Sequence, residues 1–182
     1  METTVSKFRP LDMAYIAVFA ALMAICSWIS IPTAIPFTLQ TMGIFLAVGL
    51  LGGKRGTLAV LIYVLLGAVG APVFSGFSGG AGVLFGQTGG YIMGFLFTAL
   101  LMWALERFVG QSLPRLALSM ALGLLVCYAF GTAWFMLLYT RSTGPVTLSA
   151  ALGWCVVPYI LPDLVKIAVA LTLTARLRRH VR

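Results

Sequence analysis

The chain has 182 residues, of which 61% are hydrophobic and only 9% are charged. Soluble domains carry roughly 25% charged residues, so this composition excludes a water-soluble globular protein and indicates one membrane-embedded domain, residues 1–182. The formal net charge is +8, but ten of the twelve Lys and Arg lie at the chain ends or in short clusters between apolar segments. No basic face is left over for a phosphate backbone, which argues against nucleic-acid binding.

Six apolar segments follow one another along the chain, and each is predicted to be a helix that crosses the membrane. Their bounds are 13–31, 37–51, 57–69, 89–105, 116–139 and 156–173. A crossing helix needs roughly 20 residues. The first, fifth and sixth segments satisfy this length, whereas the second, third and fourth have only 15, 13 and 17 residues. Such short segments indicate either a binding site near the membrane midplane or bounds that are a few residues too narrow.

Basic residues predict how the chain is oriented. They lie at the two chain ends, between the second and third segments, and between the fourth and fifth: Lys7, Arg9, Lys54, Arg55, Arg107, Arg115, Arg176, Arg178, Arg179 and Arg182. Positively charged loops stay in the cytoplasm, so both chain ends are predicted to be cytoplasmic and only Arg141 falls in an outer loop. The first ten residues precede no cleavage site, so we expect them to stay attached. The predicted location is a bacterial inner membrane.

The first apolar segment carries two overlapping Ala-xxx-Ala pairs, Ala17 with Ala21 and Ala20 with Ala24. Small residues at this spacing allow another helix to approach closely. The approaching helix can belong to the same chain or to a partner subunit, and the sequence leaves both interpretations open.

Residues 71–88 form a long apolar connection on the predicted outer side, and seven glycines lie between Gly76 and Gly90. A long apolar loop is poorly solvated by water, and its backbone groups need partners in a membrane. We therefore expect this segment to fold down as a lid or a re-entrant segment. The alternative is a flexible apolar connector.

Two ionisable residues, Asp163 and Lys166, lie within apolar surroundings near the end of the chain. A charge at such depth costs at least about 2.5–3.5 kcal/mol. The i, i+3 spacing places both side chains on one helix face, where they can partly neutralise each other. Pro158 and Pro162 are predicted to break the helix just before Asp163 and to leave a fresh helix start with free N–H groups. The pair is either a ligand site or an ion pair that only holds helices together.

Further polar side chains lie at the same predicted depth, near the outer face. They open the second and fourth segments and are predicted to share a pocket with the charged pair: Thr38, Gln40, Thr41, Gln87, Thr88 and Tyr91. Taken singly, each is explained as well by helix capping or by anchoring at the membrane interface.

No catalytic or metal-binding constellation occurs in the sequence. Cys26, Cys127 and Cys155 lie far apart inside apolar segments, and the only histidine, His180, lies in the basic tail. We expect buried free thiols, no metal and no cofactor. The glycine-rich run lacks the lysine of a nucleotide-binding P-loop. An enzyme is therefore not expected, and ATP hydrolysis would have to come from another subunit.

Four separated stretches occur in the order typical of one membrane-protein family: 35–41 (IPFTLQT), 65–74 (LLGAVGAPVF), 86–91 (GQTGGY) and 162–166 (PDLVK). With these motifs the chain resembles, over nearly its whole length, BioY, the biotin-binding S component of energy-coupling-factor (ECF) vitamin transporters. The resemblance implies the all-α S-component fold with six transmembrane helices and a biotin pocket closed by outer loops. It also implies partners, namely an energy-coupling transmembrane subunit and ATPase subunits.

The same resemblance implies roles for individual residues. Asp163 would accept an N–H of the biotin ureido ring, and Lys166 would donate to a biotin oxygen. Tyr91 and the backbone of residues 79–90, which includes Gly79 and Gly80, would line the lid side. The Ala-xxx-Ala face of the first helix would meet the energy-coupling subunit.

Two positions depart from the usual pattern of the family: Gln87 replaces a proline and Pro162 replaces a glycine. The first adds a polar group to the lid, and the second stiffens the approach to the charged pair. Three hypotheses follow. The protein is a vitamin-binding subunit that needs ATPase partners, a self-sufficient secondary transporter of biotin or a similar vitamin with Asp163 as its proton-coupling site, or a membrane scaffold.

Overall fold

A computed structural model describes residues 9–33 and 35–181 of the chain. The predictions for Lys7, Arg182 and the first eight residues lie outside this part, as does the side chain of His180.

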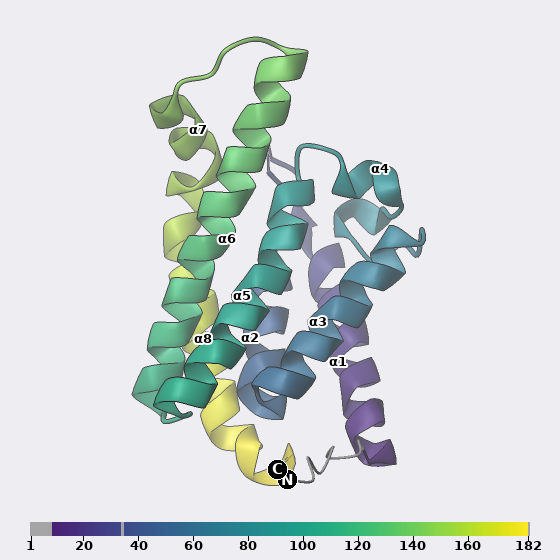
Figure 1. Cartoon of the computed structure of the whole chain (residues 1–182), viewed down its shortest axis with the longest axis vertical. Coiled ribbons are helices and arrows are strands. Elements are labelled where there is room, and N and C mark those ends of the chain that lie inside the picture. The colour runs from purple at the N-terminus through teal and green to yellow at the C-terminus, as the bar shows by residue number, and fades with distance from the viewer. Residues whose placement is uncertain (1–8, 34, 182) are drawn as a thin grey trace, which may run out of the picture.

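The body of the molecule is a helical bundle. Four of the described helices are long and apolar enough to cross a membrane: α1 (Pro10–Trp28), α5 (Gly89–Val109), α6 (Leu113–Ser142) and α8 (Val157–Val181). Two further helices, α2 (Gln40–Leu51) and α3 (Gly53–Ala68), have 12 and 16 residues. In Figure 1 the start of α1 lies at the same end of the bundle as the end of α8.

Helix α2 is short and is enclosed by protein on nearly all sides. Ten of its twelve residues are buried, and it packs against α1, α3, α5 and α8. A Cβ at Gly49 would lie 2.7 Å from the hydroxyl oxygen of Thr174 in α8, so glycine allows the two helices to approach closely. A helix that is apolar on all sides belongs in a core. Its length need not match the thickness of the bilayer.

Short elements cluster at the end of the bundle opposite to the chain ends. Strands β1 (Ser30–Ile31) and β2 (Phe37–Thr38) form an antiparallel pair in which Ser30 faces Thr38 and Ile31 faces Phe37. The 3₁₀ helix η1 (Ser75–Phe77) and α4 (Ala81–Leu84) lie in the glycine-rich segment, residues 71–88, and α7 (Leu148–Cys155) precedes α8. Figure 1 shows α4 beyond the end of α3 and α7 beside the end of α6.

The strand pair explains why α1 and α2 differ from the segments predicted from hydropathy. The first segment is predicted to reach Ile31, but α1 ends at Trp28. Pro32 disfavours a helical conformation at Ile31 because its ring clashes with the preceding residue. The second segment is predicted to begin at Phe37, but this residue pairs in β2 and α2 begins at Gln40.

The prediction that the prolines break the last helix just before Asp163 is wrong. Helix α8 begins at Val157 and continues through Pro162. Pro158 lies in the first turn, where backbone N–H groups have no helical partner in any case. Pro162 removes only the one bond that its N–H would donate to the Pro158 carbonyl. Asp163 therefore lies in the second turn of a continuous helix.

Polar contacts join the helices at the end of the bundle where the described chain begins and ends. Asp12 of α1 pairs with Arg55 of α3 at 3.2 Å. Arg178 of α8 donates to the carbonyl oxygen of Gln111, in the turn between α5 and α6, at 2.7 Å. Basic residues at this end of the bundle thus connect its helices.

Candidate functional site

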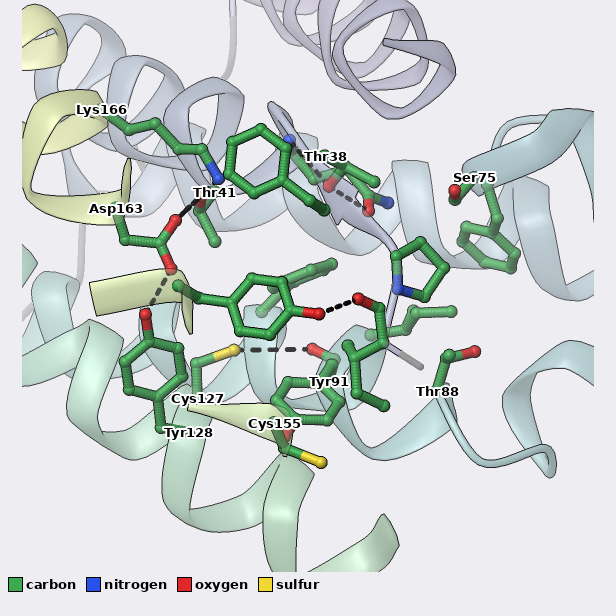
Figure 2. Close-up of a pocket in the computed structure, with 18 of the residues that line it drawn as sticks. Thr38, Thr41, Ser75, Thr88, Tyr91, Cys127, Tyr128, Cys155, Asp163 and Lys166 are labelled. Carbon is green, nitrogen blue, oxygen red and sulfur yellow. Dashed lines mark hydrogen bonds and ion pairs between the residues drawn. The ribbon is translucent and has the colours of Figure 1, made fainter. Parts of the chain in front are cut away.

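A pocket lies inside the bundle where α2, α5 and α8 begin. Its wall is formed by β2 and the two residues before it, the glycine-rich segment, the N-terminal parts of α2, α5 and α8, and the helices α6 and α7. Most lining side chains are aliphatic or aromatic, and polar side chains lie at two ends of the pocket. Figure 2 shows one polar end with Asp163, Lys166, Thr41 and Tyr128, and the other with Ser75 and Thr88.

The Asp163 carboxylate is the centre of the first polar end. The residue is only 3% exposed. Its Oδ1 accepts from the Lys166 ammonium at 2.7 Å and from the Thr41 hydroxyl at 3.2 Å, and its Oδ2 accepts from the Tyr128 hydroxyl. A carboxylate has about four lone-pair positions. These three donors therefore leave about one acceptor position on Oδ2.

Lys166 is 6% exposed and contacts an aromatic wall. Its Nζ lies 4.1 Å from the centre of the Phe37 ring, a cation–π contact that partly replaces water around the ammonium. The Phe37 ring in turn stacks on Tyr159, with ring centres 6.4 Å apart. The Tyr159 hydroxyl donates to the Ile35 carbonyl oxygen. The β1–β2 connection is thus held against the charged pair.

Gln40 and Tyr91, two of the predicted site residues, line the pocket, but their polar groups bond to the protein. The Gln40 amide donates to the Tyr63 hydroxyl at 2.5 Å, and its carbonyl accepts from Thr38 at 2.9 Å. The Tyr91 hydroxyl lies 2.9 Å from the Thr132 hydroxyl. Both residues therefore offer a ligand mainly the apolar parts of their side chains.

The glycine-rich segment folds back onto the bundle, and four of its residues line the pocket: Phe74, Ser75, Val83 and Thr88. Gln87, Gly79 and Gly80 do not line it. Gln87 is exposed. A Cβ at Gly79 would overlap the Ala71 carbonyl, and Gly80 has a φ of +96°, so both glycines are explained by the path of the backbone.

The helix α1 presents its two alanine pairs to different surroundings. Ala20 and Ala24 are 3% and 6% exposed and lie in the core, whereas Ala17 and Ala21 are exposed. Of these four alanines, only Ala17 and Ala21 are therefore accessible from outside the bundle.

The sequence prediction missed several aromatic members of the site. Tyr128 is the most consequential, because it bonds directly to Asp163. A signal was present, since a phenol hydroxyl in the middle of an apolar helix needs a buried partner. Phe37 and Tyr159 also line the pocket, but nothing in their spacing distinguishes them from residues that face lipid.

All three cysteines are free and buried, as predicted. Among the described residues, no three His, Cys, Asp or Glu side chains gather in a way that could hold a metal ion.

An apolar helical bundle with a buried pocket that has two polar ends near one face is the architecture of a membrane protein that binds a small solute. The chain belongs to the BioY family, whose pattern matches residues 1–182. It is 42% identical to the biotin transporter BioY of Thermotoga maritima, over 89% of this chain and 92% of that protein. It is 34% identical to the biotin transporter BioY2 of Lactococcus lactis subsp. cremoris, over 85% and 83%.

The fold also matches a solved structure. A crystal structure of the S-component for biotin from an ECF-type ABC transporter superposes with a TM-score of 0.80 and 28% sequence identity, covering 92% of this chain and 90% of that chain. The protein is therefore a cell-membrane protein of a transporter family, with the S-component fold, and not an enzyme.

Proposed function

We propose that this protein binds biotin in the pocket from the outer side of the membrane and delivers it to the cytoplasm as the substrate-binding subunit of a larger transporter. The observation that carries the proposal is the Asp163–Lys166 ion pair. Both side chains are buried inside the helical bundle, and both line the pocket. Each edge of a cyclic urea places an N–H donor beside a carbonyl acceptor. Asp163 supplies the acceptor for the N–H, and Lys166 supplies a donor for the carbonyl.

The second polar end of the pocket suits the other end of biotin, an anionic carboxylate on an aliphatic chain. Ser75 and Thr88 lie there, and Thr88 is the N-cap of α5, although its side chain does not cap the helix. The start of a 21-residue helix carries a partial positive charge that favours an anion. Apolar lining between the two ends matches the aliphatic chain.

The proposed topology has six crossings with both chain ends in the cytoplasm. It is supported by the positions of the basic residues and by the shared end of α1 and α8 (Figure 1). Labelling with a membrane-impermeant maleimide in intact spheroplasts tests it. Ser142→Cys should react before lysis and Ser112→Cys only after lysis, since both serines are exposed at opposite ends of α6. The reverse pattern would contradict the orientation.

The proposed partners are an energy-coupling membrane subunit and ATPase subunits. The exposed Ala17 and Ala21 of α1 leave a shallow surface that a partner helix can approach closely. The alternative of a proton-coupled secondary transporter is less well supported. Protonating Asp163 would weaken hydrogen bonds that join α8 to α2 and α6.

Two measurements test this function. The purified protein should retain biotin, identified by mass, and should bind it reversibly in calorimetry once it has been removed; a membrane scaffold would bind none. Uptake into proteoliposomes should require the ATPase module. Uptake that persists without ATPases and collapses with the proton gradient would instead support the secondary transporter.

A further inference from the structure

An apolar groove runs along the surface of the bundle at the end where α6 begins and α8 finishes. It is lined by one residue of α6 and by one face of α8: Leu113, Leu171, Thr172, Ala175 and Arg176. Leu113 is 45% exposed. The Thr172 hydroxyl donates within its own helix, to the Ala168 carbonyl at 2.8 Å, so it presents mainly its methyl group. The groove therefore has an apolar wall and a single charged group.

Two arginines at this end of α8 have no partner in the described part of the chain. Arg176 lines the groove, and Arg179 lies one turn further on; neither makes a hydrogen bond or an ion pair with a described residue. Arg178, between them, is occupied, because it donates to the Gln111 carbonyl. Since Gln111 lies in the turn between α5 and α6, this bond fixes the arginines at the level where the chain leaves the membrane.

No carboxylate in the described part of the protein pairs with Arg176 or Arg179. Thr172, Arg176 and Arg179 are spaced i, i+4 and i+7, so they share one face of α8. The three described carboxylates have other partners: Asp12 pairs with Arg55, Asp163 pairs with Lys166, and Glu106 accepts from the Gly53 N–H. Two guanidinium groups thus remain at the end of an apolar groove.

Arginine beside an apolar surface selects for an amphiphile with an anionic headgroup. A guanidinium can donate two parallel hydrogen bonds to a phosphate, while acyl methylenes fill an apolar groove by contact. Basic pockets between helices on the cytoplasmic side of a membrane are suited to anionic lipid headgroups. A zwitterionic headgroup carries its own cation close to the phosphate and would be repelled in part by the second arginine.

We propose that this groove is a binding site for one anionic phospholipid of the inner leaflet, with its phosphate on Arg176 and Arg179 and an acyl chain along Leu113 and Leu171. The lipid would connect α6 to α8 at the end of the bundle opposite to the pocket. The site is independent of what the pocket binds, although it assumes that this end faces the cytoplasm.

The test compares phosphatidylglycerol with phosphatidylcholine on the purified full chain in detergent. Phosphatidylglycerol should raise the midpoint of thermal unfolding by about 3 °C more than phosphatidylcholine. Native mass spectrometry should show one retained phosphatidylglycerol. The double substitution Arg176→Gln/Arg179→Gln should abolish both the preference and the retained lipid. Arg141→Gln, which removes an exposed arginine at the opposite end of the bundle, should leave both unchanged.

Three outcomes would overturn the proposal. They are equal stabilisation by the two lipids, an unchanged phosphatidylglycerol preference in the double variant, and an equal effect of inorganic phosphate without lipid. Biotin binding by the double variant shows that it is folded. Because that binding is measured separately, failure of the lipid site and failure of the biotin function are distinguishable.

Discussion

The Asp163 carboxylate accepts hydrogen bonds from side chains on three helices: Lys166 on α8, Thr41 on α2 and Tyr128 on α6. The sequence left open whether the ion pair is structural or binds a ligand. The contacts show that the two roles are compatible. Three donors fix the carboxylate, and its remaining acceptor position is available at the wall of the pocket. Since hydrogen bonds to a charged group are worth about 1.5–3 kcal/mol, each donor should matter for binding.

Removing the Tyr128 hydroxyl tests this arrangement. Tyr128→Phe keeps the ring but takes one donor from Asp163, so the carboxylate is held less firmly. We expect biotin to bind about tenfold more weakly, which corresponds to about 1.4 kcal/mol. Isothermal titration calorimetry on the purified variant measures this change. Tyr139→Phe is the matched control, because Tyr139 lies on the same helix and contacts Phe135 and Trp154 through its ring. Equal affinities for the two variants would exclude a role for the Tyr128 hydroxyl.

At the scale of elements, α1 has one face in the core and one face on the outside. The exposed pair should be needed for transport and the buried pair for stability. Ala17→Leu and Ala21→Leu should leave biotin affinity unchanged and reduce uptake severalfold, because a larger side chain keeps a partner helix at a distance. Uptake in cells that carry the transport partners provides the measurement. Ala168→Leu, at an exposed alanine of α8, is the control.

Substitution in the buried pair, Ala20 and Ala24, should lower the stability of the protein. Ala20→Leu inserts three heavy atoms at a position that is 3% exposed, and overpacking of this kind costs about 1–3 kcal/mol. The midpoint of thermal unfolding should therefore fall by several degrees. Normal stability of Ala20→Leu together with normal uptake by Ala17→Leu would contradict the assignment of Ala20 to the core and of Ala17 to a partner surface.

The glycine-rich segment is attached to the bundle by two tryptophans. Trp134 on α6 donates to the Gly86 carbonyl at 3.0 Å, and Trp28 on α1 donates to the Pro72 carbonyl at 2.9 Å. If the segment closes the pocket, Trp134→Phe should raise the dissociation rate of biotin about fivefold, the effect of losing about 1 kcal/mol. Stopped-flow displacement measures the rate. Trp154→Phe, where the indole makes only a ring contact, should not change it.

Some elements could be predicted from the sequence and others could not, for a physical reason. The long helices follow from hydropathy because a membrane requires continuous apolar stretches. The β1–β2 pair depends on tertiary contacts, such as the bond from the Tyr159 hydroxyl to the Ile35 carbonyl oxygen, which leave no periodic pattern. The continuous α8 was mispredicted because Pro162 stands close enough to the helix start that only one backbone bond is lost.

For the whole molecule, composition and charge were sufficient to predict a helical membrane protein, and separated motifs were sufficient to predict its family. The composition of the pocket was less predictable. Asp163 and Lys166 are conspicuous because a charge in lipid is costly, whereas Phe37 and Tyr159 look like any other apolar residue of a membrane helix. Hydrophobicity predicts which segments lie in the membrane, but only packing decides which side chains face a cavity.

In the proposed function, the Asp163–Lys166 pair is retained in the membrane because it binds the ureido ring of biotin. Lys166→Met alone would leave a buried carboxylate without its cation and would strongly destabilise the fold. The informative variant is therefore the double substitution Asp163→Asn/Lys166→Met, which removes both charges. Asp12→Asn is the control, since it removes a buried carboxylate that pairs with Arg55 at the other end of the bundle.

Equilibrium binding of biotin to these purified proteins is the most direct measurement. We predict that Asp12→Asn binds like the wild type and that the folded double variant binds at least about tenfold more weakly, since unpaired ligand groups in a buried site cost about 1–3 kcal/mol. Wild-type affinity in a folded double variant would contradict the claim and leave the ion pair with a structural role alone.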